Sequence, residues 1–102
     1  FPSAGTRLQI LDETLEVIKR LWTEETVTFQ GKHLAFDGAY CDPKPIQQLP
    51  ELWIGGGGEK VTLRLVAEHA DAWNTFGPPD TYAHKNAVLD DWCAQLGRDP
   101  PL

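Results

Sequence analysis

The sequence has no methionine, only two cysteines and no long apolar run. Cys41 and Cys93 lie far apart and form no CxxC pair, so they indicate neither a disulfide framework nor a metal site. We expect two reduced thiols in a cytoplasmic protein, with a single bridge between them as the alternative. No apolar stretch reaches the roughly 18 residues of a membrane span, so we expect no membrane partner.

Positive charge is also scarce, because 9 bases face 15 acids and the net charge is -6. The bases are scattered along the chain, which argues against a nucleic-acid partner. His33, His69 and His84 lack the spacing of metal ligands. Asp90 and Asp91 are adjacent on an expected helix, so they point to different sides and form no catalytic pair. We place no metal ligand and no catalytic residue in this chain.

The length of 102 residues predicts at most a single compact domain. With 41% hydrophobic and 24% charged residues, the composition is that of a globular protein. The first residue is Phe1 rather than Met, so we expect the natural start to be missing or processed.

Periodic apolar residues predict that the segment 1–23 is helical. We expect the helix itself to begin near Thr6, because Thr6 and Gln9 have the spacing of a capping box. Residues 24–51 then form a hairpin and a proline-rich loop. β-branched and aromatic residues predict strands at 26–29 and 32–36, joined by a tight turn at Gln30–Gly31.

The second half of the chain reads as strand, helix, strand, helix. The apolar run 52–54 predicts a buried strand, residues 59–69 a helix and residues 70–76 a further strand. A third helix begins after a cap at Asp80 or Thr81 and ends at Gly97, a residue suited to the position after a helix. This βαβα order over 52–102 is typical of a parallel sheet, so the fold class is α/β.

Four consecutive glycines, Gly55, Gly56, Gly57 and Gly58, stand where the strand meets the helix. Glycine admits positive φ and close approach of a ligand, and amides near a helix start favour an anion. Lys60 could add a positive charge, which Glu59 beside it opposes. A phosphate cradle, a tight turn and a flexible linker remain open, although the flanking strand and helix argue against a linker. The sequence lacks the GK[ST] ending of a Walker A loop.

The stretches "PKPIQQLPELWIGGGGEKVTLRLVAEHADAWN", "LDETLEVIKRLWTEETVTFQGKHLAF" and "CAQLGRDP" resemble the bacterial luciferase-like monooxygenase family, particularly its coenzyme F-420-dependent oxidoreductases. The resemblance implies a (β/α)8 TIM barrel in which residues 26–36 belong to an insertion at the C-terminal face. It also implies that the four glycines hold the phosphate of a flavin or deazaflavin. Trp73 and Asn74 would lie near the cofactor pocket, although a core aromatic and a strand-end polar residue are the alternative.

A complete barrel needs roughly 250 residues, so we expect an incomplete segment of a barrel. The resemblance implies hydride transfer between coenzyme F-420 and a small organic substrate. One alternative is an FMN-dependent monooxygenase, because FMN also carries a phosphate. Another is a non-catalytic truncated module that self-associates. The expected partner is therefore a second copy of the chain or the remainder of a larger chain, since a free βαβα unit leaves sheet edges uncovered.

Overall fold

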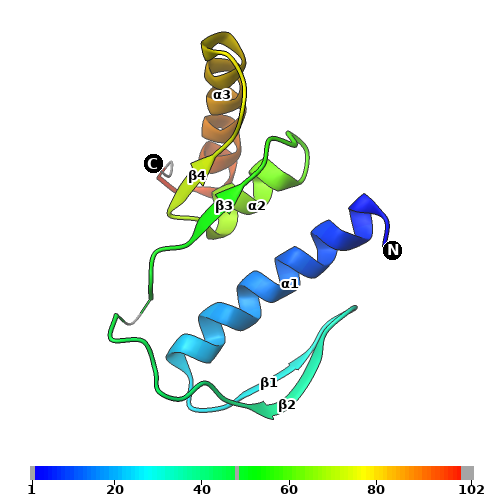
Figure 1. Cartoon of the computed structure of the whole chain (residues 1–102), viewed down its shortest axis with the longest axis vertical. Coiled ribbons are helices and arrows are strands. Elements are labelled where there is room, and N and C mark those ends of the chain that lie inside the picture. Colours follow the sequence, from blue (N-terminus) through cyan, green and yellow to red (C-terminus); the bar gives the residue numbers. More distant parts are fainter. Residues whose placement is uncertain (1, 48, 100–102) are drawn as a thin grey trace. The chain divides into compact units, whose positions relative to one another are not determined.

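The computed structural model describes residues 2–47 and 49–99. The chain divides into two compact units, Phe1–Pro50 and Glu51–Leu102. The boundary lies one residue from the expected junction between the hairpin segment and the βαβα segment. Both units can be followed in Figure 1.

The first unit contains helix α1 (Ala4–Thr23) and a hairpin of two strands. Ser3 caps the helix, because its Oγ accepts a hydrogen bond from the Thr6 amide at 3.2 Å. The prediction that α1 begins near Thr6 with a capping box is therefore wrong, and the helix starts two residues earlier. Of its apolar side chains, Leu15 and Val17 are buried.

Strands β1 (Val27–Gln30) and β2 (Ala35–Ala39) pair antiparallel, so the predicted hairpin is confirmed. Its predicted turn at Gln30–Gly31 is wrong, because the Gly31 amide still donates to the Leu34 carbonyl at 2.8 Å. The chain reverses at residues 32–33 instead. A Cβ at Gly31 would collide with the Glu13 carboxylate, so any other residue there would displace that side chain.

The Glu13 carboxylate ties this turn to α1. It accepts hydrogen bonds from the amides of His33, at 3.1 Å, and Leu34, at 3.2 Å. Through these bonds the side chain of Glu13 links α1 to the hairpin.

Replacing Glu13 with alanine should lower the free energy of unfolding by about 1–2 kcal/mol, because both amides lose a charged acceptor. Urea unfolding of Glu13→Ala measures this loss. Glu16→Ala is the matched control, since Glu16 is exposed on the same helix. Equal losses in the two variants would contradict the assignment.

The second unit confirms the predicted βαβα order. Strands β3 (Trp53–Gly55) and β4 (Ala72–Asn74) pair parallel, with Ile54 opposite Trp73 and Gly55 opposite Asn74. Figure 1 shows the two strands side by side, with helices α2 (Thr62–His69) and α3 (Pro79–Leu96) in the same unit. Its buried apolar residues are Ile54, Leu63, Leu65, Val66, Ala67, Ala70, Ala72, Trp73, Leu89 and Cys93.

Three predictions for this unit need correction. The run 52–54 is not buried throughout, because Trp53 is 63% exposed. Helix α2 begins at Thr62 rather than Glu59, since residues 59–61 form a turn. Helix α3 begins at Pro79, whose fixed φ suits a first helical position, and it has no side-chain cap from Asp80 or Thr81.

The predicted end of α3 is confirmed, because Gly97 adopts a φ of 69° and its amide bonds back to the helix. Cys41 and Cys93 are both free thiols. Among residues 2–47 and 49–99, no helix combines the length and apolarity needed to cross a membrane.

Candidate functional site: a glycine corner at a strand end

The four glycines, called here the glycine corner (residues 55–58), turn the chain at the carboxyl end of β3. Gly55 is the last residue of that strand and lies opposite Asn74, the last residue of β4. In α/β proteins with parallel strands, ligands bind at this end of the sheet. Gly56 has a φ of +131°, which non-glycine residues rarely adopt.

The glycine corner begins a row of backbone amides that lack internal acceptors. The Gly56 amide donates to the Asn74 carbonyl at 3.0 Å, so it is occupied. Within the part of the chain that the structure describes, the amides of residues 57–62 donate no hydrogen bond. We call these amides the amide row. In proteins, successive amides without internal acceptors are a recurrent type of anion-binding site.

The carbonyl groups of the same segment are, by contrast, occupied by side-chain donors. Trp73 Nε1 donates to the Gly56 carbonyl at 2.7 Å. Lys85 Nζ donates to the Gly57 carbonyl at 2.7 Å, and Trp92 Nε1 donates to the Glu59 carbonyl at 2.8 Å. Side chains from β4 and α3 therefore hold the backbone of this segment in place.

The Glu59 carboxylate adds an ion pair to this arrangement. Its oxygens lie 2.8 Å from Lys85 Nζ and 3.1 Å from His84 Nε2. The hydrogen bond from Lys85 holds the pKa of Glu59 below its usual value, against the raising effect of desolvation, and His84 lowers it further. A lowered pKa means that the pair stabilises the fold above the ordinary glutamate pKa and is lost as the pH falls through the folded value.

A hollow of about 280 Å³ opens beside the corner. It is lined by Gly55, Gly56, Gly57, Asn74, Thr75 and Phe76. A Cβ on Gly57 would lie 2.9 Å from Thr75 Oγ1, and one on Gly58 would lie 3.0 Å from Thr62 Oγ1. Side chains at these two positions would therefore crowd the hydroxyls of Thr75 and Thr62.

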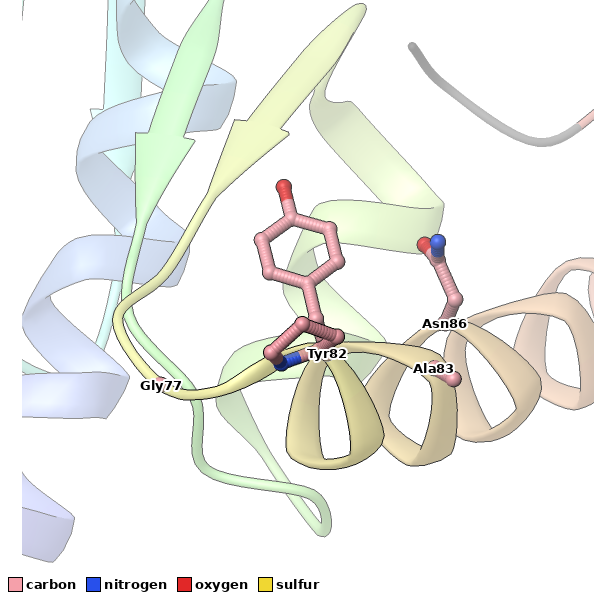
Figure 2. Close-up of a pocket in the computed structure, with 5 residues that line it drawn as sticks. Gly77, Tyr82, Ala83 and Asn86 are labelled. Atoms are coloured by element: carbon pink, nitrogen blue, oxygen red, sulfur yellow. The ribbon is translucent and has the colours of Figure 1, made fainter.

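A second hollow of about 490 Å³ lies at the start of α3 and is lined by Gly77, Pro79, Tyr82, Ala83 and Asn86. Figure 2 shows the side chains of Tyr82 and Asn86 projecting from the same side of that helix. The Tyr82 ring lies 5.2 Å from the Trp73 ring, centroid to centroid, at an interplanar angle of 44°. Trp73 therefore connects the glycine corner to the wall of this hollow.

The structure brings most of the predicted binding residues together. Three of the four glycines, Gly55, Gly56 and Gly57, line one hollow together with the exposed Asn74. Gly58 does not line it and is the last residue of the glycine corner. Trp73 is buried, as the core alternative expects, yet its indole also holds the corner. The Lys60 side chain is exposed and makes no hydrogen bond or ion pair within the described residues.

Sequence reasoning missed Lys85 and Trp92. They stand seven residues apart, a spacing that places them on one face of α3. The sequence shows this spacing, but it does not show which loop packs against that face of α3.

The sequence profile of the luciferase-like monooxygenase family matches residues 3–101. An F-420-dependent glucose-6-phosphate dehydrogenase of Microbacterium testaceum is 33% identical over 101 residues, which cover 96% of this chain and 30% of that protein. An uncharacterised protein of Mycobacterium bovis is 30% identical over 95 residues, 93% of this chain and 34% of that protein. The chain thus spans about a third of the length of these relatives.

Among solved structures, the chain is similar to an F-420-dependent secondary alcohol dehydrogenase in complex with an F-420–acetone adduct. The TM-score is 0.86 at 26% identity, covering 98% of this chain and 31% of that one. The expected fold is confirmed: an α/β segment of a TIM-barrel enzyme, without a closed barrel. With a profile match over nearly its whole length, the chain belongs to the luciferase-like monooxygenase family.

Proposed function

We propose that this chain supplies the phosphate-binding corner of a coenzyme F-420-dependent oxidoreductase, which transfers hydride between the deazaflavin and a small organic substrate. The observation that carries the proposal is the amide row, residues 57–62, which lacks acceptors among the described residues and follows the carboxyl end of a parallel strand.

The residues present fit a phosphate group. Hydrogen bonds from amides to a charged oxygen are stronger than those between neutral groups. Six successive amides, those of residues 57–62, have no bonded acceptor among the described residues. The amides of Gly57 and Gly58 would bind the phosphate, while Asn74 and Thr75 border the hollow beside them. Coenzyme F-420, when bound, supplies the hydride chemistry, and this chain contributes binding and orientation.

The names of the relatives support F-420 as the cofactor. The Microbacterium testaceum relative and the structurally similar alcohol dehydrogenase are both described as F-420-dependent. A phosphate cradle by itself does not separate F-420 from FMN, because each cofactor carries a phosphate.

Titration of the purified protein with F-420 and with FMN, followed by fluorescence, tests the proposal. We expect F-420 to bind at least about tenfold more tightly, a difference of roughly 1.4 kcal/mol. The reverse order would assign the chain to FMN-dependent enzymes. Failure of both cofactors to bind below millimolar concentration would contradict cofactor binding and favour a non-catalytic module.

A further inference from the structure

We infer that Lys85 and Trp92 on α3 are positioning residues that aim the amide row at the cofactor phosphate. The inference rests on the proposed function and adds residues that bind no cofactor atom themselves. Both side chains donate to backbone carbonyls of the segment that follows β3, across 28 residues for Lys85 and 33 for Trp92.

Peptide geometry explains how a bond to a carbonyl sets the direction of an amide. A trans peptide is planar, and its C=O and N–H point in opposite directions. Holding the Gly57 carbonyl therefore aims the N–H of Gly58 away from Lys85. Holding the Glu59 carbonyl likewise aims the N–H of Lys60 away from Trp92.

Trp73 acts in the same way from β4, since its bond to the Gly56 carbonyl aims the N–H of Gly57. The three amides set in this way, those of residues 57, 58 and 60, are all members of the amide row. Without these donors a run of four glycines would sample many backbone conformations, because glycine has the largest conformational freedom. Fixing that freedom before the ligand arrives lowers the entropic cost of binding.

Lys85 acts here as a hydrogen-bond donor more than as a positive charge for the phosphate. Its ammonium bonds the Gly57 carbonyl at 2.7 Å and the Glu59 carboxylate at 2.8 Å, so a carboxylate already neutralises it. Its side chain is 22% exposed, which is consistent with a fixed position. A lysine that served as a mobile counter-charge would instead be expected to reach solvent, as the exposed Lys60 does.

The test compares F-420 with the same deazaflavin lacking the phosphate, because the affinity ratio of the two ligands isolates the phosphate contribution. Lys85→Met and Trp92→Phe should each lower this ratio by about tenfold, the effect of one hydrogen bond to a charged group. The affinity for the phosphate-free deazaflavin should change less than about twofold, since no contact to the ring system is removed. Lys85→Arg keeps a donor and should recover part of the ratio.

Two control variants match these changes. Lys32→Met removes the same charge from an exposed residue of the first unit, and Trp53→Phe removes an indole N–H that faces Glu51 instead of the corner. Both should keep the wild-type ratio. Circular dichroism checks that each variant folds, and if Lys85→Met does not fold, the milder Trp92→Phe carries the test.

The outcomes separate the inference from the function on which it rests. A wild-type protein that binds both ligands equally would overturn the phosphate site and the inference together. A normal wild-type ratio that persists in both variants would overturn the inference alone. Equal weakening of both ligands would show a merely structural role. A loss confined to Lys85→Met that disappears at high salt would show that Lys85 acts through its charge.

Discussion

Gly57→Val is expected to weaken the binding of coenzyme F-420 by about 100-fold, or roughly 2.7 kcal/mol. A Cβ at this position would lie 2.9 Å from Thr75 Oγ1 and 3.8 Å from Lys85 Cε. Because the first distance is too short, the Thr75 hydroxyl or the corner backbone must move. Under the proposed function, the added methyl groups would also take up space that the phosphate needs beside the amide row. Each lost hydrogen bond between a backbone amide and a charged oxygen lowers the binding free energy by about 1.5–3 kcal/mol.

Fluorescence titration of Gly57→Val with F-420 measures this loss. Gly5→Val is the control, because an added Cβ at Gly5 on α1 meets no atom within 4 Å. Combining Gly57→Ala with Thr75→Ala separates the two causes, since the second change removes the colliding hydroxyl. If Gly57→Val bound F-420 as tightly as the wild type, the glycine corner would not contact the phosphate.

The parts of the fold that the sequence predicted correctly depend on local patterns. The βαβα order follows from short apolar runs that alternate with amphipathic segments, and Gly97 is a residue that readily takes a positive φ at a helix end. These preferences depend on neighbouring residues only, so contacts with distant parts of the chain do not override them.

The errors arise where a distant residue or a competing cap decides the local structure. Ser3 supplies a side-chain oxygen ahead of Thr6, so α1 starts earlier. Glu13 binds the amides of His33 and Leu34, about 20 residues away, and this contact accompanies the displaced hairpin turn. A single sequence carries no signal for a contact of this range.

The site shows the same division. The glycines and the neighbouring Asn74 are visible as a pattern, because their conformational freedom and their place after a strand are local properties. The donors Lys85 and Trp92 look like ordinary helix residues. Only the packing of α3 beside α2 and the corner shows what they hold.

Leu65→Ala is expected to lower the free energy of unfolding by about 2–5 kcal/mol, the range for removing a buried leucine side chain. Leu65 is fully buried on α2, and the first residue of this helix, Thr62, is the last residue of the amide row. Because domains are stable by only about 5–15 kcal/mol, the loss is a large part of the total. Urea unfolding measures it, with Leu96→Ala as control, since Leu96 is 44% exposed at the end of α3 and its loss should cost less than about 1 kcal/mol. Equal losses would mean that α2 does not bury this face in solution, and the orientation of the amide row at its start would then lose its support.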